Sequence, residues 1–429
     1  MFLRVLNIKL FYRIIKLKYI LICIIFFMVE KGLTDFFEGY LNKEFLFKNR
    51  KVLQSNYIPE NIFYRENEIK QIASILAPSL KMEKPSNVFI YGRTGTGKTL
   101  CIKYVVSNMF DVAKKKNVNL KIIYLNCKLK KVADTEYRLM AQLTREFGVE
   151  VPATGLPTDE VYKGFVKYLD EKNLLLLIVL DEIDQLIDKV GDEILYNLTR
   201  LNSELVKSEI SIIGISNNLV FADNLDPRVK SSLSEEEIIF SPYNAQQLQK
   251  ILEDRSKLAF KENILEEGVI EKCAAYAARE HGDARRALEL LRIAGELAER
   301  SNEKKIGFGH IDSAEEKIER DRIINMVNTQ PKQFKLTLYS IFEMSLKANK
   351  CIFTGDIYDL YKDLCFKTGD RPLTQRRISD IIAELDMLGI INAKVISKGR
   401  YGRTREICLA IPNSVASKIN NMLKEGLNL

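Results

Sequence analysis

Short apolar runs and helically spaced apolar residues alternate along the first half of the chain. The runs at 88–91, 122–125, 174–180 and 210–215 are largely continuous, which is typical of parallel strands buried on both faces. The stretch after the first run instead places apolar residues at helical spacing over 102–110. Strands that alternate with helices in this way predict an α/β fold built on a parallel sheet.

The pattern changes near Asn244. From there to about Arg322 the spacing is almost purely helical, with no strand signal. Within this stretch Asp283 is placed to cap a helix whose apolar face runs from Ala284 to Ala298. The segment is therefore predicted to form a separate all-α lid domain.

Three further helices are predicted beyond Pro331. The first covers 334–347, and Thr354 and Thr374 are expected to cap the second and the third. Gly389 follows the last apolar position of the third helix and is expected to end it.

Two predicted strands, Ile390–Ile396 and Glu406–Ile411, enclose the basic, glycine-hinged loop Ser397–Arg405. Three helices and such a hairpin predict a winged helix, whose third helix enters the major groove and whose hairpin reaches the backbone or the minor groove. The alternative is a winged helix that contacts protein, which the charge of the hairpin argues against. The candidate DNA-binding residues are Arg371, Gln375, Arg376 and Ser379 on or near the third helix, and Lys398, Arg400, Arg403 and Arg405 in the hairpin.

The first apolar run leads into the G-x-x-x-x-G-K-T pattern of a P-loop. Its glycines let backbone N–H groups cradle phosphate oxygens, Lys98 reaches the β- and γ-phosphates, and the Thr99 hydroxyl takes a Mg²⁺ ligand position. The helix that follows points its N-terminus at the phosphates. We therefore expect ATP or ADP with Mg²⁺ as cofactors. The expected nucleotide-binding residues are Gly92, Arg93, Thr94, Gly95, Thr96, Gly97, Lys98, Thr99 and Leu100.

The run at 174–180 ends in two carboxylates, Asp181 and Glu182. Such residues lie beside the P-loop, where the first can hold Mg²⁺ and the second can polarise an attacking water. We assign Asp181 to the metal and Glu182 as the catalytic base; the alternative is a buried strand that ends in an acidic turn. Asn217 follows the run at 210–215 and either orients water beside the γ-phosphate or is a simple turn residue.

Composition narrows the function further. The chain has 429 residues, which suggests two or three domains, and its seven cysteines show no C-x-x-C spacing while there are only two histidines. A zinc site and a disulfide framework are therefore not expected. The cysteine usage instead predicts a protein of a reducing compartment. The net charge of +8 is uneven: residues 1–29 carry +5, residues 331–429 carry +6, and the part between them carries −3. A basic C-terminal region suggests a polyanion partner, against the alternative of an ordinary solvated surface.

The N-terminus stands apart from the rest of the chain. Residues 19–29 are eleven apolar residues behind a basic stretch. A membrane span needs about 20 such residues, and no small-residue cleavage site follows, as a signal peptide would require. We expect translation to begin at Met28, with residues 1–27 a misassigned upstream segment and no membrane association; a membrane anchor is the alternative.

Taken in order, these motifs resemble an AAA+ ATPase. More narrowly, the segments Leu225-Asp-Pro-Arg-Val-Lys-Ser-Ser-Leu233 and Gly282-Asp-Ala-Arg-Arg-Ala-Leu288 resemble the archaeal replication initiators related to the origin recognition complex and cell-division-control (Orc/Cdc) proteins. The resemblance covers about residues 45 to 411, including Pro59 and the Arg65-Glu66 pair in the adenine-side lead-in. It implies an AAA+ parallel-sheet core, an all-α lid and a C-terminal winged-helix domain.

The resemblance also implies roles for single residues. Asn217 would sense the γ-phosphate, and Arg285 in the lid would contact the nucleotide, with its neighbour Arg286 as the alternative. Arg228 would be the finger that completes a neighbouring subunit's site, against the alternative of a structural salt bridge. The basic insert within 128–171 resembles the insertion by which such initiators touch DNA, although it carries no sharp motif.

The sequence therefore predicts an ATP-dependent replication initiator that binds double-stranded origin DNA and helps recruit or load the replicative helicase of the minichromosome maintenance type. Homologous initiator subunits are further expected partners, hydrolysis is expected to be slow and switch-like, and the location is expected to be cytoplasmic and chromosome-associated. The alternatives are a transcriptional regulator whose winged helix reads an operator, and a clamp-loader-like remodeler, which the winged helix disfavours. The predicted domains after residue 27 are a core over 28–240, a lid over 241–328 and a winged helix over 329–429.

Overall fold

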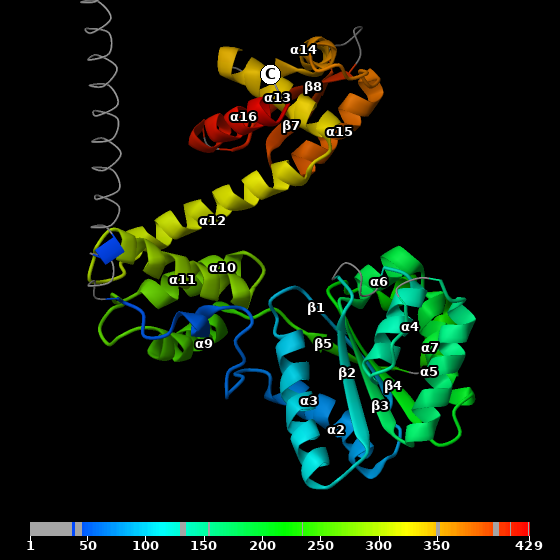
Figure 1. The fold of residues 1–429 in the computed structure, drawn as a ribbon. Helices are drawn as coiled ribbons and strands as arrows, with labels where there is room; N and C mark the ends of the chain where they lie inside the picture. Colours follow the sequence, from blue (N-terminus) through cyan, green and yellow to red (C-terminus); the bar gives the residue numbers. More distant parts are fainter. Residues whose placement is uncertain are drawn as a thin grey trace, which may run out of the picture. The chain divides into compact units, whose positions relative to one another are not determined.

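The chain folds into two compact units that divide between Phe308 and Gly309 (Figure 1). The structure is a computed structural model. It describes residues 37–38, 45–128, 134–152, 155–233, 235–348, 352–397, 403–411, 413–427 and 429. The expectations about residues 1–27 and a start at Met28 lie outside these residues.

A parallel sheet of five strands organises the first unit. The strand order is β2-β3-β4-β1-β5, so β1 lies between β4 and β5, and β3 lies between β2 and β4. β1 and β3 are buried along their whole length, as expected of inner strands. The strands are β1 (Asn87–Gly92), β2 (Leu120–Asn126), β3 (Leu175–Asp181), β4 (Glu209–Ser216) and β5 (Glu235–Phe240).

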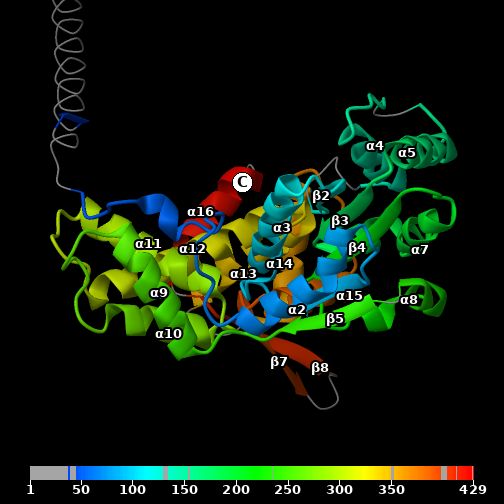
Figure 2. The same cartoon turned by 90° about the horizontal axis from the view of Figure 1, so that it is seen from below.

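Helices cover both faces of this sheet, because alternate residues of each strand point to opposite sides. Leu175, Leu177 and Val179 pack with α2 and α3, whereas Leu176 and Leu180 pack with the helices of the other face. The first face carries α2 (Glu66–Leu76) and α3 (Lys98–Lys115), and the second carries α4 (Glu136–Arg145), α5 (Thr158–Lys172), α6 (Ile183–Val190) and α7 (Glu193–Arg200). Figure 2 shows α4 and α5 side by side and α8 (Pro227–Leu233) near β5.

The lid consists of three helices: α9 (Ala245–Ala259), α10 (Val269–Arg279) and α11 (Ala284–Arg300). Asp283 caps α11 by accepting from the backbone N–H groups of Arg285 and Arg286, as predicted. The segment before the sheet is fixed to this lid, because the buried Glu299 carboxylate accepts from the N–H groups of Leu46 and Phe47. Residues 54–63 therefore connect the N-terminal segment, which is held by the lid, to the elements of the sheet domain.

The second unit is a winged helix, entered through the long helix α12 (Phe308–Thr329). Its helices surround one apolar core, and its three strands form an antiparallel sheet in the order β6-β8-β7. In Figure 2 the β7–β8 hairpin extends away from the helices of this unit. The elements are α13 (Lys332–Ala348), β6 (Ile352–Phe353), α14 (Thr354–Lys367), α15 (Gln375–Met387), β7 (Ile391–Ser397), β8 (Arg403–Leu409) and α16 (Asn413–Leu427).

Some expected details are confirmed and others are wrong. Thr374 caps α15 by accepting from the N–H of Arg377, and α15 ends just before Gly389, as predicted. Thr354 is not a cap: it is the first residue of α14, and its hydroxyl accepts from the N–H of Arg405 in β8 instead. The strand β5 and the last helix, α16, had no counterpart in the sequence interpretation. Cys408 is disulfide-bonded, whereas Cys101, Cys127 and Cys365 form no disulfide.

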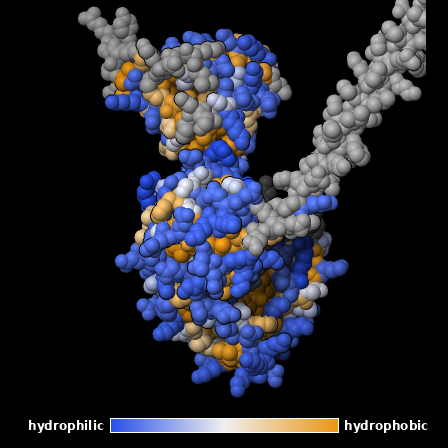
Figure 3. All heavy atoms as spheres, turned by 90° about the vertical axis from the view of Figure 1, so that its left-hand side faces the viewer, coloured by the Kyte–Doolittle hydropathy of each residue, from blue (hydrophilic) through white to orange (hydrophobic). Residues whose placement is uncertain are grey.

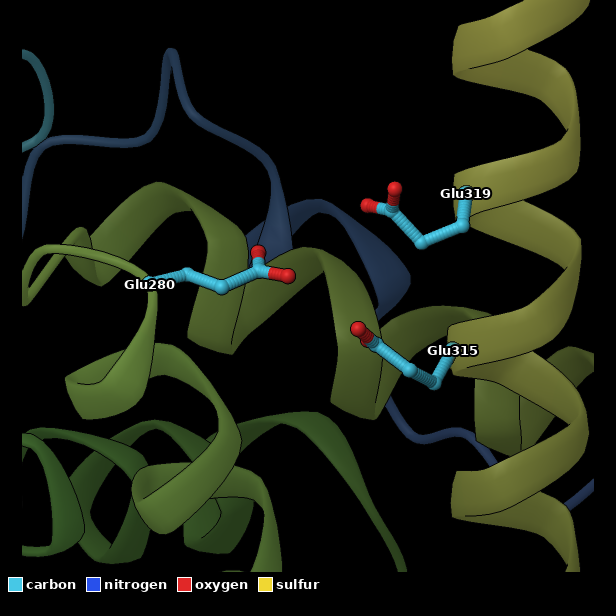
Figure 4. A group of neighbouring side chains, drawn as sticks. All are labelled: Glu280, Glu315 and Glu319. Carbon is cyan, nitrogen blue, oxygen red and sulfur yellow. The ribbon is translucent and has the colours of Figure 1, made fainter. Parts of the chain in front are cut away.

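Hydrophilic side chains cover most of the face shown in Figure 3. Among the described residues, no helix has the length and apolar character needed to cross a bilayer. Figure 4 draws Glu280, which follows α10 and pairs with Arg286 at 3.1 Å, and Glu315 and Glu319 on α12. Because Glu280 belongs to the first unit and the other two to the second, these carboxylates are not assigned a common ligand.

Candidate functional site: nucleotide cavity and winged-helix face

The P-loop joins the end of β1 to the start of α3. Gly95 and Gly97 have φ angles of +72° and +93°, a region that glycine enters without steric cost. Gly97 precedes the first residue of α3, so the unpaired N–H groups of that helix face the loop. A loop of this shape concentrates positive potential where phosphate oxygens would lie.

Lys98 lies folded back onto its own loop. Its Nζ donates to the carbonyls of Gly92 (2.6 Å) and Arg93 (2.7 Å) and to Oδ1 of Asn217 (3.0 Å). Burial, with Arg285 as the second cause, lowers the pKa of Lys98 to about 8. Each of the three N–H donors of the ammonium group thus has an oxygen acceptor. Phosphate oxygens can replace these acceptors.

Asp181 ends β3 directly beside the start of α3. Its carboxylate accepts from the Thr99 hydroxyl at 3.1 and 3.3 Å and from the Tyr124 hydroxyl on β2. A hydroxyl and a carboxylate on adjacent elements are oxygen donors of the kind that Mg²⁺ prefers. The residues predicted to hold the metal, Thr99 and Asp181, are therefore in contact.

Glu182 follows in a left-handed conformation, with φ of +56°. This conformation costs energy for a residue with a Cβ, and such strain is concentrated at functional sites. The Glu182 carboxylate is 3.6 Å from Nζ of Lys128, which is exposed at the end of β2. The predicted base thus forms an ion pair with Lys128.

Asn217 is positioned by an acidic residue that the sequence interpretation did not use. The Asp184 carboxylate on α6 accepts from the Asn217 backbone N–H (3.3 Å) and from the Ser216 hydroxyl (3.1 Å). Because the Asn217 side chain contacts Lys98, one network joins the P-loop, the end of β3 and the end of β4. Sequence spacing alone could not identify Asp184, since its role depends on α6 lying next to β4.

The lid touches the P-loop directly. The N–H of Ala284 donates to the Gly95 carbonyl at 3.2 Å, and Nη1 of Arg93 lies 2.9 Å from Nδ1 of His281. Arg285 lines the cavity above the loop, whereas Arg286 turns to Glu280. Arg285 thus lies where a nucleotide contact requires it, and its contact with the nucleotide stays a prediction.

A cavity extends from the P-loop between the lid and the segment 54–63. The buried Arg65 holds Tyr243, a lining residue, in place: its guanidinium donates to the carbonyls of Thr96 and Ser241 and lies 4.1 Å from the centre of the Tyr243 ring. This mostly apolar space next to a phosphate loop suits a base and ribose. Its lining includes Tyr57, Pro59, Ile62, Phe63, Gly95, Gly97, Thr99, Leu100, Lys103, Tyr243, Asp254, Ala284, Arg285 and Leu288.

Arg228 lies away from this cavity, on α8. Its side chain is 84% exposed, and its Nε pairs with the Asp226 carboxylate at 3.2 Å. The guanidinium lines a separate surface hollow with Asp192, Glu193 and Tyr196. Arg228 is therefore not one of the residues that line the nucleotide cavity of its own chain.

The winged helix presents a polar hollow between α15, the start of α14 and the two wing strands. Gln375 and Arg376 are exposed on α15, and Ser379 lies one turn further along the same helix. Arg405 on β8 donates from Nη1 to the Ser379 carbonyl at 2.8 Å, so it joins the wing to α15. The hollow is lined by Thr354, Gly355, Gln375, Arg376, Ser379, Val395, Thr404 and Arg405.

The other candidates in this unit are less fully described. Arg371 is exposed before α15, and its carbonyl accepts from Gln333 at 3.4 Å. Lys398 and Arg400 lie outside the described residues, and only the backbone of Arg403, the first residue of β8, is described. Within the insert of the first unit, Arg138 pairs with Asp134, and Arg145 donates to the Val151 carbonyl.

Comparisons with known proteins identify the family. Residues 81–217 match the model of an AAA domain, residues 249–316 the Cdc6 AAA+ ATPase-type lid domain, and residues 325–418 the CDC6 C-terminal winged helix domain. The ORC1-type DNA replication protein of Thermococcus onnurineus is 51% identical over 406 residues, 94% of this chain and 96% of the relative. The chain belongs to the ORC1-type DNA replication proteins. ORC1-type DNA replication protein 1 of Methanosarcina mazei is 48% identical over 91% of the chain and 94% of its own length.

Solved structures agree with this family assignment. The Aeropyrum pernix ORC1 protein in complex with DNA has a TM-score of 0.77 and 45% identity, over 89% of this chain and 98% of that one. The Aeropyrum pernix ORC2 protein in ADPNP–ADP complexes, at 23% identity and a TM-score of 0.56, shares the fold. The predicted family and the predicted architecture of AAA+ core, all-α lid and winged helix are thus confirmed. The chain is therefore an AAA+ ATPase of the ORC1 type, while the roles of single residues and the domain bounds stay predictions.

Proposed function

We propose that this protein is a DNA-replication initiator, which binds double-stranded origin DNA in a nucleotide-dependent state. The observation that carries the proposal is the polar face of the winged helix, where Gln375 and Arg376 on α15 stand beside the two strands of the wing. A relative with 45% identity is named as an ORC1 protein in complex with DNA, and the curated relatives reported above are named replication proteins. None of them is named a transcriptional regulator, which was the alternative.

The nucleotide cavity supports ATP binding and hydrolysis. Lys98, whose ammonium group contacts the Gly92 and Arg93 carbonyls, would bind phosphate oxygens, and Thr99 and Asp181 would hold Mg²⁺. Bound Mg²⁺ would neutralise charge on the phosphates. Glu182 would accept the proton of the attacking water once its ion pair with Lys128 opens, and Asn217 would orient that water.

Hydrolysis is proposed to act as a switch. The contacts of Ala284 with Gly95 and of His281 with Arg93 tie the lid to the P-loop, so a change in the loop reaches α11 directly. A ligand that binds one lid position better than another shifts the population toward it. A slow ATPase of this kind holds one state until hydrolysis releases it.

The proposed partners follow from the two exposed arginine surfaces. Arg228 faces outward and is proposed to reach the nucleotide of a homologous initiator subunit. The winged helix is proposed to hold origin DNA, so the protein would be cytoplasmic and chromosome-associated. Recruitment of a replicative helicase of the minichromosome maintenance type is proposed from the family alone.

A duplex titration tests the DNA proposal. Fluorescence anisotropy with an origin duplex and a random duplex, at several salt concentrations and with ATP or ADP, separates base contacts from phosphate contacts. The proposal requires tighter binding of the origin duplex and a loss of that preference in Arg376→Ala, at a cost of about 1–3 kcal/mol. Lys70→Ala, on the exposed face of α2, is the matched control in the other unit. If the protein lacking residues 331–429 binds duplexes as well as the full chain, the winged helix is not the DNA site, and the basic insert takes its place.

A further inference from the structure

One side chain outside the predicted site contacts the metal-side carboxylate. Tyr124 lies in the middle of β2, where the sequence suggested only a buried strand position, and its hydroxyl donates to Oδ2 of Asp181. β2 and β3 are parallel neighbours, with Tyr124 level with Val179, two residues before Asp181. Val179 packs with α2 and α3, so the alternation along β3 turns Asp181 to the same face as Tyr124 and Thr99.

Other contacts fix the Tyr124 ring and keep its hydroxyl a donor. Nζ of Lys103, one turn after Thr99 on α3, lies 4.5 Å from the centre of the ring, within the range of a cation–π contact. Because the Asp181 carboxylate accepts, the Tyr124 hydroxyl is the donor of their hydrogen bond.

The two oxygens of Asp181 are held from different directions. Oδ1 accepts from the Glu182 backbone N–H at 3.1 Å, and Oδ2 accepts from Tyr124. The Thr99 hydroxyl also donates to this carboxylate, and its oxygen keeps lone pairs for a metal ion. Tyr124 adds a second side-chain donor to the groups that set the rotation of the carboxylate, and it is not itself a predicted metal ligand.

We propose that Tyr124 is a positioning residue for metal binding, which fixes the orientation of the Asp181 carboxylate toward the Thr99 hydroxyl. This inference rests on the proposed Mg²⁺–nucleotide site. Partners that hydrogen-bond a metal-binding carboxylate typically contribute 10- to 100-fold to metal affinity, and removal of the Tyr124 hydroxyl is expected to cost about 10-fold.

The chain supplies a matched control in Tyr91. This residue is also a buried tyrosine of the same sheet, on β1, but its hydroxyl has no hydrogen-bond partner among the described residues. Tyr124→Phe and Tyr91→Phe remove the same atom from the same sheet. Mn²⁺ would replace Mg²⁺ as a spectroscopic probe, and its affinity would be measured by electron paramagnetic resonance in the ADP-loaded full-length protein. Fluorescent ADP binding in EDTA would report nucleotide affinity without metal.

Tyr124→Phe is expected to weaken Mn²⁺ binding about 10-fold and to leave metal-free ADP affinity unchanged, while Tyr91→Phe changes neither. In an Asp181→Asn background, Tyr124→Phe should have no further effect on Mn²⁺ affinity, because its influence passes through the carboxylate. If Tyr124→Phe and Tyr91→Phe bind Mn²⁺ equally and the wild type binds it normally, the role of Tyr124 is wrong. The proposed metal site would not be affected by that result. Failure of the ADP-loaded wild type to bind Mn²⁺ would overturn the proposed metal site and this inference with it.

Discussion

Replacement of Gly95 by alanine should separate the lid from the P-loop. Gly95 has φ of +72°, and a Cβ at this position would lie 1.7 Å from Oδ1 of Asp283. That oxygen caps α11 by accepting from the N–H groups of Arg285 and Arg286. Asp283 must therefore move, and the contact between the Ala284 N–H and the Gly95 carbonyl must lengthen.

The expected cost has two parts. A left-handed alanine costs about 1–2 kcal/mol relative to glycine. Loss of the Asp283 cap adds about 1 kcal/mol. Gly148→Ala separates the two parts, because Gly148 has a φ of +82° but nothing within 4 Å of the added Cβ. Gly148→Ala should therefore show the cost of a left-handed alanine without the cost of a lost helix cap.

The assay is urea unfolding without nucleotide, for both glycine variants and for Asp283→Ala alone and combined with Gly95→Ala. Gly95→Ala should lower the free energy of unfolding by about 1 kcal/mol more than Gly148→Ala does. The combination with Asp283→Ala should cost less than the sum of the two single changes, because the clash and the lost cap are the same event. Equal losses in the two glycine variants, together with additive effects in the combination, would refute the view that the lid docks through Gly95.

Three further predictions concern ATP hydrolysis and the charge of Lys98. Glu182→Gln should bind ATP as the wild type does but hydrolyse it far more slowly, since only the base is lost; equal steady-state phosphate release would contradict the assignment. Arg228→Ala should leave ATP affinity unchanged and remove only the rate increase that appears at high protein concentration, so concentration-independent hydrolysis by the wild type would exclude a role in a neighbouring site. Between the Lys98 pKa of about 8 in the folded protein and its ordinary value of about 10.4 in the unfolded chain, the unfolded chain binds more protons. The free energy of unfolding should therefore rise with pH across this window. If it rises by the same amount in Lys98→Met, titration of Lys98 is not the cause.

The core of the site was predictable because its parts are local in sequence or lie at strand ends. Eight consecutive residues form the P-loop, and Asp181 and Asn217 were found because the carboxyl ends of parallel strands meet at one edge. Tyr124 and Asp184 were not found, because their roles depend on which strands and helices are neighbours. In the sequence, Tyr124 looks like an ordinary strand residue, and Asp184 looks like part of an ordinary acidic turn.

The winged helix shows a similar division. Thr374 was identified as a cap from its position alone. Thr354 was not correctly assigned, because the N–H of Arg405, 51 residues later on β8, donates to its hydroxyl. β5 was missed because three consecutive glutamates open it, and such an edge strand has a weak apolar signal. The DNA-binding role of Arg405 remains a prediction, and its bond to the Ser379 carbonyl shows that it also holds the wing against α15.

Chromatin immunoprecipitation of the protein, read against a map of replication start sites in the same cells, tests the central proposal most directly. The account predicts few binding sites, located where replication begins, and their loss when Arg376→Ala replaces the wild-type protein. Binding distributed over promoters, with replication starts unoccupied, would contradict it.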